Sequence, residues 1–179
     1  MLIESIFSGF GGQGVLSMGK LLAYAAMKEG REVSWMPSYG PEMRGGTANC
    51  MVNISDEPIS SPVVTEYDVV VALNLPSLKK FEARVKKGGI LLWESSTIKQ
   101  PPTRTDINCI ALPAIDLATN ELKNVKVMNM IVLGALVKLK NAVKKDSLIL
   151  ALKETLPPRN HNLIPLNEKA IELGMNSVR

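Results

Sequence analysis

Nearly continuous apolar runs recur along the chain, each bounded by polar residues. The clearest runs lie within residues 68–73, 90–94 and 107–112. Such runs indicate strands that are buried on both faces, as in the middle of a parallel sheet. Residues 15–27 instead repeat apolar side chains three and four positions apart, which predicts an amphipathic helix. Together with a first strand at 2–8, this helix begins a βαβ unit and predicts an α/β fold.

A different pattern marks residues 47–55. Apolar and more polar positions alternate there, with Ala48, Cys50, Val52 and Ile54 on one face and Thr47, Asn49, Met51 and Asn53 on the other. This alternation predicts a half-exposed strand, and therefore an antiparallel member at one end of the sheet. A second strand is predicted at 32–36, before this one.

Further helices are predicted in the rest of the chain. They cover residues 74–87, 127–137, 147–156 and 166–173, the third capped by Asp146 and the last reached through a linker at 157–165. The helix at 127–137 is apolar nearly all round, so we expect the sheet and either the next helix or another chain to cover it.

Composition is that of an ordinary globular domain. Hydrophobic residues make up 46% and charged residues 21% of the 179 positions, which predicts a single domain over 1–179 with a core of its own. The net charge is +4, aromatic residues are 4%, and the basic–aromatic interleaving of nucleic-acid binders is missing. Since no membrane span or signal peptide is recognisable, we expect a cytoplasmic protein that binds neither nucleic acid nor membrane.

The residue inventory gives little support to metal or nucleophilic chemistry. Cys50 and Cys109 are the only cysteines, and both lie in apolar strand-like runs, where buried free thiols are expected. Two thiols do not supply the usual four thiolates of an iron–sulfur cluster. The single histidine, His161, lies in the linker, so neither a metal site nor a Ser-His-Asp triad is expected. No residue is assigned a catalytic or metal-binding role.

A glycine-rich turn follows the first strand. It contains Gly9, Gly11, Gly12, Gln13 and Gly14. Glycine lets the chain reverse within a few residues, often at positive φ, and the N–H groups of the next helix then face an anion or a partner's backbone. The spacing also matches the dinucleotide fingerprint, but the acidic residue expected after the second strand is missing. A bound nucleotide and a structural or partner-facing turn both remain open.

The most unusual segment covers residues 37–46. Two prolines and three glycines predict irregular structure, yet the segment also carries Tyr39, Glu42 and Arg44. One interpretation is a turn braced by a Glu42–Arg44 ion pair. The other is a rigid loop that presents these three side chains to a ligand or partner.

Together the two segments resemble a known family. Gly9-Phe10-Gly11-Gly12-Gln13-Gly14-Val15 and Ser38-Tyr39-Gly40-Pro41-Glu42-Met43-Arg44-Gly45-Gly46 are similar to motifs of the gamma subunits of 2-oxoacid:ferredoxin oxidoreductases. The late segment Asn167-Glu168-Lys169-Ala170, followed by Gly174, resembles the C-terminal helix of that family. The resemblance covers nearly the whole chain. It implies a three-layer α/β/α sandwich with a mixed, mostly parallel central sheet, like the gamma domain of pyruvate:ferredoxin oxidoreductase.

The resemblance also implies one part of a multi-subunit enzyme, with alpha, beta and ferredoxin-like delta subunits as partners. Such enzymes oxidatively decarboxylate a 2-oxoacid with coenzyme A and give acyl-CoA, carbon dioxide and reduced ferredoxin. Thiamine diphosphate, magnesium and iron–sulfur clusters are then expected mainly in the other subunits, because hard chemistry is carried by cofactors. This chain alone is expected to hold no cofactor and to be inactive. Residues 39–46 are closer to the 2-oxoglutarate and branched-chain members than to the pyruvate members, which favours 2-oxoglutarate.

Within this family, both segments are expected to line the approach to the thiamine centre or the coenzyme A channel. The residues implied in cofactor binding are Gly9, Gly11, Gly12, Gln13, Gly14, Tyr39, Glu42, Arg44, Gly45 and Gly46. Arg44 is the candidate for a phosphate or carboxylate contact, because its guanidinium is planar and always charged. The beta subunit of indolepyruvate:ferredoxin oxidoreductase shares the glycine turn and is one alternative. A free-standing Rossmann-like nucleotide-binding module and a purely structural assembly protein are the others.

Overall fold

One six-stranded sheet forms the centre of the molecule. The computed structural model describes residues 1–39 and 46–178, without the side chain of Tyr39. The strands are β1 (Leu2–Phe10), β2 (Glu32–Tyr39), β3 (Thr47–Ser55), β4 (Tyr67–Ala72), β5 (Val85–Glu94) and β6 (Asn108–Leu112). The helices are α1 (Val15–Lys28), α2 (Leu75–Phe81), α3 (Ala114–Asn120), α4 (Met128–Lys140), α5 (Lys145–Thr155) and α6 (Ile164–Asn176). Short 3-10 helices are η1 (Glu82–Arg84), η2 (Val125–Val127) and η3 (Pro158–Leu163).

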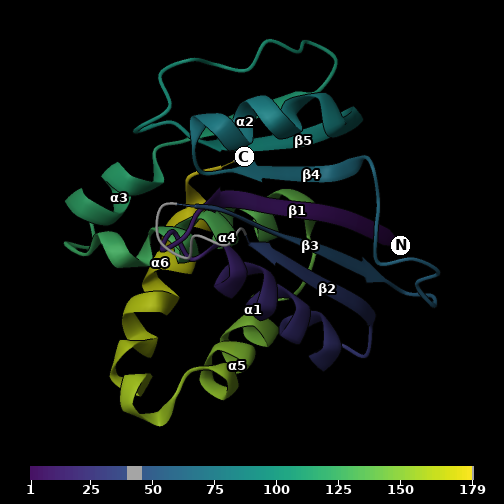
Figure 1. Cartoon of the computed structure of the whole chain (residues 1–179). Coiled ribbons are helices and arrows are strands. Elements are labelled where there is room, and N and C mark those ends of the chain that lie inside the picture. Colours follow the sequence, from purple (N-terminus) through teal and green to yellow (C-terminus); the bar gives the residue numbers. More distant parts are fainter. Residues whose placement is uncertain (40–45, 179) are drawn as a thin grey trace.

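The sheet has a parallel half and an antiparallel half. Its strand order is β2-β3-β1-β4-β5-β6 (Figure 1). β1, β4, β5 and β6 pair in parallel, whereas β3 lies antiparallel between β1 and β2. The antiparallel strand predicted at 47–55 is confirmed, although it is the second strand from the edge. The predicted α/β class with a mixed, mostly parallel sheet is confirmed as well.

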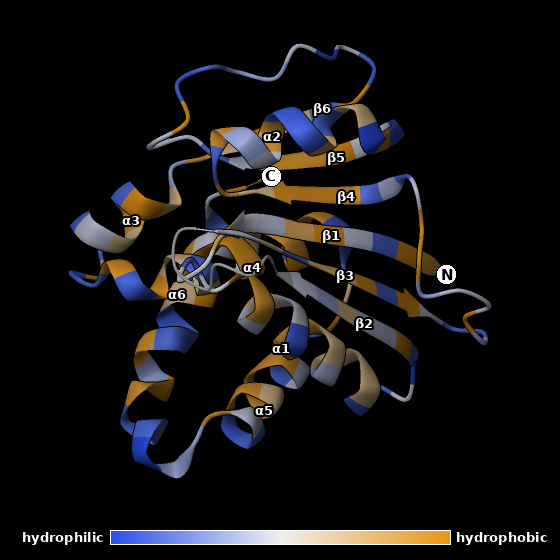
Figure 2. Cartoon of the chain, viewed as in Figure 1, coloured by the Kyte–Doolittle hydropathy of each residue, from blue (hydrophilic) through white to orange (hydrophobic). Residues whose placement is uncertain are grey.

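Helices cover the two faces of the sheet unequally. α1, α4, α5 and α6 share one large core with the sheet. On the opposite face, α2 packs in a smaller core with side chains of β1, β4 and β5. Figure 2 shows that β4 and β5 are strongly hydrophobic, as strands covered on both faces should be. On β3 the face with Ala48 and Cys50 is buried, while Thr47 is exposed, because an antiparallel strand can keep one face towards water.

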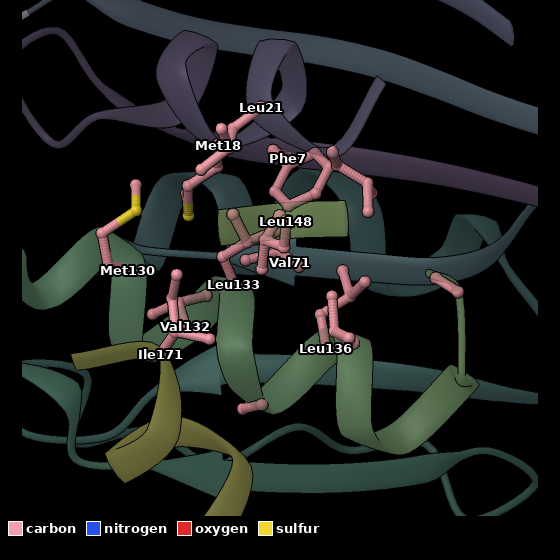
Figure 3. Close-up of a cluster of buried hydrophobic side chains, with 14 of the residues drawn as sticks. Phe7, Met18, Leu21, Val71, Met130, Val132, Leu133, Leu136, Leu148 and Ile171 are labelled. Carbon is pink, nitrogen blue, oxygen red and sulfur yellow. The ribbon is translucent and has the colours of Figure 1, made fainter. Parts of the chain in front are cut away.

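Helix α4 is buried nearly all round, as its sequence predicts. Its buried side chains run without a break from Met130 to Val137. Figure 3 shows how side chains of β1, α1, β4, α4, α5 and α6 converge there, among them Phe7, Leu133 and Ile171. The helix that mainly covers α4 is α6, and the prediction that the next helix, α5, would do so is wrong. None of the helices in the described ranges is long and apolar enough to cross a membrane.

Two glycines allow α4 and α6 to touch backbone to backbone. A Cβ added to Gly134 would lie 2.1 Å from the carbonyl oxygen of Ile171. A Cβ added to Gly174 would lie only 1.9 Å from the carbonyl oxygen of Ile131. The predicted end of the last helix at Gly174 is wrong, since α6 continues to Asn176. Gly174 is needed for the helix crossing, not for termination.

The prediction of irregular structure from residue 37 onwards is also wrong in part. β2 runs through Pro37 to Tyr39, and Pro37 pairs with Cys50 in the register of β2 and β3. Proline is tolerated there because β2 is an edge strand, where one side of the backbone has no ladder partner to lose.

The helix predicted at 74–87 is too long. α2 ends at Phe81, and β5 already begins at Val85, which pairs with Tyr67 of β4. The register then shifts, so that Ile90 pairs with Val69, and Gly88 takes up the extra length at φ 75°. Gly88 and Gly89, which directly follow the predicted helix, instead belong to an irregular strand.

Two further side-chain expectations need correction. Asp146 lies in the first turn of α5 but does not cap it, because the N-cap residue is Lys144. Cys50 is buried, and burial raises the pKa of its thiol to about 12, but Cys109 is exposed because β6 is the other edge strand. The predicted linker at 157–165 contains η3, and α6 begins at Ile164.

A buried carboxylate joins the end of β5 to the start of α3. Glu94 is 1% exposed. It accepts hydrogen bonds from the N–H groups of Ser96 (3.0 Å), Thr97 (2.9 Å) and Ile115 (3.3 Å), and from the hydroxyl of Thr97 (2.7 Å). Burial alone would raise the pKa of this carboxyl, but the hydrogen bonds outweigh it, so the pKa is lowered from 4.5. Ser96 Oγ also accepts from Asp116 N–H of α3.

The Gly174→Ala substitution is predicted to destabilise the fold strongly. The added methyl group meets backbone that cannot rotate away, so α4 and α6 must separate, and we expect a loss of about 3 kcal/mol in the free energy of unfolding. Urea denaturation measures this loss, with Lys169→Ala on the exposed face of α6 as the control. Equal stability of the two variants would contradict the backbone contact.

The Glu94→Gln substitution is predicted to destabilise the fold in a pH-dependent way. At neutral pH we expect a loss of about 2 kcal/mol, because the amide replaces an acceptor of two hydrogen bonds by a donor. A lowered pKa means that the ionised group stabilises the fold above its unfolded pKa and that this contribution is lost as pH falls through the folded pKa. The gap between wild type and variant should therefore shrink as the pH falls below the ordinary carboxyl pKa of 4.5 and through the lowered pKa of the folded state. Exposed Glu121→Gln is the control; a gap that stays constant over this range would contradict the ionised state.

Candidate functional site

The glycine turn between β1 and α1 depends on conformations that only glycine adopts easily. Gly12 has φ 94° and Gly14 has φ 76°, both in the left-handed region. Gly9 has another reason to be glycine, since an added Cβ would lie 2.6 Å from Gln13 Oε1 and 3.1 Å from Leu73 Cβ. A Cβ on Gly14 would lie 2.3 Å from Asn129 Nδ2 of α4. The turn is therefore pressed between the end of β4 and the start of α4.

Gln13 fixes the turn from within. Its Oε1 accepts a hydrogen bond from Phe10 N–H at 2.6 Å, and its Nε2 donates to the carbonyl of Leu73 at 3.2 Å. The first bond closes the turn, and the second ties it to the end of β4. Both ends of the carboxamide are thus engaged by the chain itself, so the geometry gives Gln13 a positioning role.

The two segments singled out in the sequence meet in space. Gly11 N–H donates a hydrogen bond of 3.0 Å to the carbonyl of Gly46. A cavity of about 430 Å³ opens beside this contact. It is lined by the turn, the first turn of α1 and the start of β3: Phe10, Gly11, Gly12, Gly14, Val15, Leu16, Ser17, Gly46, Thr47 and Ala48. We call it the glycine cavity.

Helix and backbone dipoles determine the electrostatic potential of the described lining of the glycine cavity. Among the residues that the structure describes, none that lines it carries a charged side chain. α1 begins at the cavity with Gly14 as its N-cap, and its first turn contains no acidic residue. The positive end of the helix dipole and the N–H groups of the first turn therefore provide the local potential, which favours a negatively charged or carbonyl-bearing group.

The predicted site residues fall into two sets. Gly9, Gly11, Gly12, Gln13, Gly14 and Gly46 come together around the glycine cavity. Glu42, Arg44 and Gly45 lie outside the described residues, and Tyr39 is described only by its backbone, which pairs with Ala48. Sequence reasoning missed Ser17 and Asn129. Ser17 follows Gly14 by three positions and could be found from helical spacing, whereas Asn129 is over 100 positions away and gives no local signal.

The sheet order argues against a dinucleotide site of the Rossmann type. In that fold the second strand lies directly beside the first, and its acidic end residue reaches the ribose. Here antiparallel β3 lies between β1 and β2, and β2 ends with Ser38 and Tyr39. Within the described ranges, no group of three or more His, Cys, Asp or Glu side chains is arranged to hold a metal ion.

The Gln13→Glu substitution is predicted to loosen the turn. A carboxylate can still accept from Phe10 N–H, but it places a second acceptor against the carbonyl of Leu73, so we expect a loss of about 1–2 kcal/mol in the free energy of unfolding. Chemical denaturation measures the loss, and the same substitution at exposed Gln100 is the matched control. If the two variants are equally stable, the hydrogen bond to Leu73 does not hold the turn.

Comparisons with known proteins agree with this architecture. The sequence profile of the pyruvate ferredoxin/flavodoxin oxidoreductase family matches residues 4–177. Ketoisovalerate oxidoreductase subunit VorA of Methanothermobacter marburgensis is 40% identical over 173 residues, which are 96% of this chain but 36% of VorA. The chain thus spans about a third of the length of that relative.

Two other proteins match along most of their own length. 2-Oxoglutarate synthase subunit KorC of Methanocaldococcus jannaschii is 38% identical over 158 residues, or 86% of this chain and 83% of KorC. The crystal structure of a keto/oxoacid ferredoxin oxidoreductase gamma subunit from Geobacter sulfurreducens superimposes with a TM-score of 0.84 at 32% identity, covering 98% of this chain and 97% of that one. The resemblance carried by the two motifs is confirmed, and this chain belongs to the pyruvate ferredoxin/flavodoxin oxidoreductase family.

Proposed function

We propose that this chain is the gamma subunit of a multi-subunit 2-oxoacid:ferredoxin oxidoreductase. In the reaction of the assembled enzyme, the carboxylate of the 2-oxoacid leaves as carbon dioxide, the remaining acyl group is joined to the sulfur of coenzyme A, and the electrons pass to ferredoxin. The observation that carries the proposal is the end-to-end likeness to a solved gamma subunit, at 32% identity over 98% of the chain.

The described residues do not fit the iron–sulfur clusters or the magnesium ion of thiamine diphosphate, since no group of three or more His, Cys, Asp or Glu side chains among them is arranged to hold a metal ion. Cys50 is buried in the core beside α1, and Cys109 is exposed on β6. The chain thus offers two thiols on different parts of the sheet, whereas a cluster needs four thiolates that lie together. We therefore assign these groups to the alpha, beta and delta partner subunits, and we place the complex in the cytoplasm.

The glycine cavity fits an anionic or carbonyl group of coenzyme A. Its backbone N–H groups and the start of α1 attract such a group without any charged side chain. Arg44, which lies outside the described residues, would add a cationic contact. The chemistry itself would be supplied by the partner subunits, while this chain orients the coenzyme and excludes water.

The acid substrate is proposed to be 2-oxoglutarate, with 2-oxoisovalerate as the nearest competitor. KorC is named as a subunit of 2-oxoglutarate synthase, and VorA is named as a subunit of ketoisovalerate oxidoreductase. The lining of the glycine cavity offers no described cation for the second carboxylate of 2-oxoglutarate. The choice between the two acids therefore belongs to the partner subunits.

Purification of the tagged chain from its own cells under anaerobic conditions tests the assembly. We expect partner subunits, iron and thiamine diphosphate in the eluate, together with coenzyme A-dependent dye reduction by one of 2-oxoglutarate, 2-oxoisovalerate, pyruvate or indolepyruvate. A chain that elutes alone, is inactive and gains thermal stability with NAD or ATP would overturn the proposal in favour of a free-standing nucleotide-binding module.

A matched pair of glycine substitutions tests the role of the cavity. Gly12 (φ 94°) and Gly30 (φ 74°) both have positive φ, and a Cβ at either would meet no heavy atom of the described residues within 4 Å. Alanine at either position should therefore cost a similar backbone strain of about 1 kcal/mol. Only Gly12→Ala places a methyl group at the glycine cavity, so we expect the KM for coenzyme A of the intact complex to rise by about tenfold, equivalent to 1.4 kcal/mol. Equal KM values for the two variants would show that coenzyme A does not bind in this cavity.

A further inference from the structure

A second cavity lies on the helical side of the molecule, beside the glycine cavity. Its volume is about 490 Å³. It is enclosed by α1, η2 and the start of α4, the end of α5, and η3 with the start of α6. Its residues are Ser17, Lys20, Leu21, Asn124, Lys126, Val127, Asn129, Met130, Leu152, Thr155, Leu156, Pro157, Leu163 and Asn167. We call it the lysine cavity.

The charge of the lysine cavity has one sign. Among the described residues, the ionisable side chains that line it are Lys20 of α1 and Lys126 of η2, without a carboxylate. Neither lysine forms an ion pair within the part of the chain that the structure describes, although five other basic side chains do. The two lysines come from elements that are distant in sequence, so the tertiary fold brings both residues to one cavity, with Lys20 Nζ 6.0 Å from the centre of the Tyr24 ring of α1. Such a site favours an anion.

Three carboxamides supply directional polar groups. Asn124 Oδ1 accepts from Lys126 N–H, and Asn129 Oδ1 accepts from Met130 N–H. Asn167 Nδ2 donates to the carbonyl of Leu163. Each amide therefore uses one end within the chain and keeps its other end for a further partner. Two donors and one acceptor remain, a set that can recognise a ligand with both kinds of group.

The inner wall of the lysine cavity is apolar. Leu21, Val127, Met130 and Leu152 are each at most 6% exposed and belong to the main core. An apolar wall with a few convergent polar groups and a volume of some hundreds of cubic ångströms is typical of a small-molecule site. A short carboxylic acid would leave most of this space empty, whereas a ring body attached to a charged group would fill it.

We propose that the lysine cavity binds a phosphorylated nucleoside of mononucleotide size. Lys20 and Lys126 hold the phosphate, the carboxamides bind the edge of the base or the ribose hydroxyls, and the apolar wall packs against the ring. The inference does not depend on the proposed gamma-subunit function. The lysine cavity also differs in composition from the glycine cavity, since Ser17 is the one residue that lines both.

Binding of AMP to the purified full chain tests the proposal. NMR titration should shift the side-chain amide signals of Asn124, Asn129 and Asn167, and inorganic phosphate or adenosine alone should bind at least tenfold more weakly than AMP. The double variant Lys20→Gln/Lys126→Gln should weaken the Kd for AMP at least tenfold. The variant Lys138→Gln/Lys140→Gln removes the same charge from the end of α4, outside this cavity, and should leave the Kd unchanged.

Three results would overturn the inference. The first is no AMP binding at millimolar concentration by a chain whose NMR spectrum shows it folded. The second is binding that both double variants weaken equally, which would indicate a diffuse charge effect. The third is tighter binding of coenzyme A than of AMP with the same amide shifts, because the lysine cavity would then be part of the coenzyme A site proposed above.

Discussion

The close approach of α1 to the antiparallel half of the sheet is the constraint on which the rest of the structure depends. A Cβ at Gly19 would lie 2.3 Å from Cys50 Sγ and 3.1 Å from Val52 Cγ2, so α1 rests on β3 with almost no side chain between them. At this spacing Cys50 donates its thiol hydrogen to the carbonyl of Val15 at 3.4 Å. The position of α1 then fixes the glycine turn at its start, and with it both cavities.

Several contacts between distant parts of the chain hold the turn once α1 is in place. Gln13 ties it to β4, Gly11 ties it to Gly46, and Asn129 of α4 packs against Gly14. Protein interiors are packed as tightly as molecular crystals. A turn that is in contact with other elements on three sides therefore has little conformational freedom. The result is a rigid set of backbone N–H groups. Backbone donors that are preorganised in this way bind a charged group without paying for rearrangement when it arrives.

Much of this architecture could be predicted from the sequence, because its causes are local. The strands at 90–94 and 107–112 and the all-apolar helix α4 follow from periodicity, and the antiparallel β3 follows from its alternation. The errors share a different cause. Gly174 looks like a helix end but serves a backbone contact with Ile131, and Pro37 looks like a strand breaker but sits on an edge. Both depend on the position of a second element, which local sequence does not encode.

The same distinction explains what could be said of the site. The glycine turn was recognisable because backbone conformation limits which residues can stand there, and Gly46 because it belongs to the second segment that resembles the family. Asn129 and the two lysines of the second cavity were not, because ordinary side chains acquire a role only when packing brings them together. A cavity whose described lining carries no charged side chain can attract an anion through helix and backbone dipoles, but these dipoles alone do not distinguish acids that differ in a remote carboxylate. The backbone N–H groups of the described lining therefore suit an anionic or carbonyl group, and discrimination between such acids requires charged side chains beyond that lining.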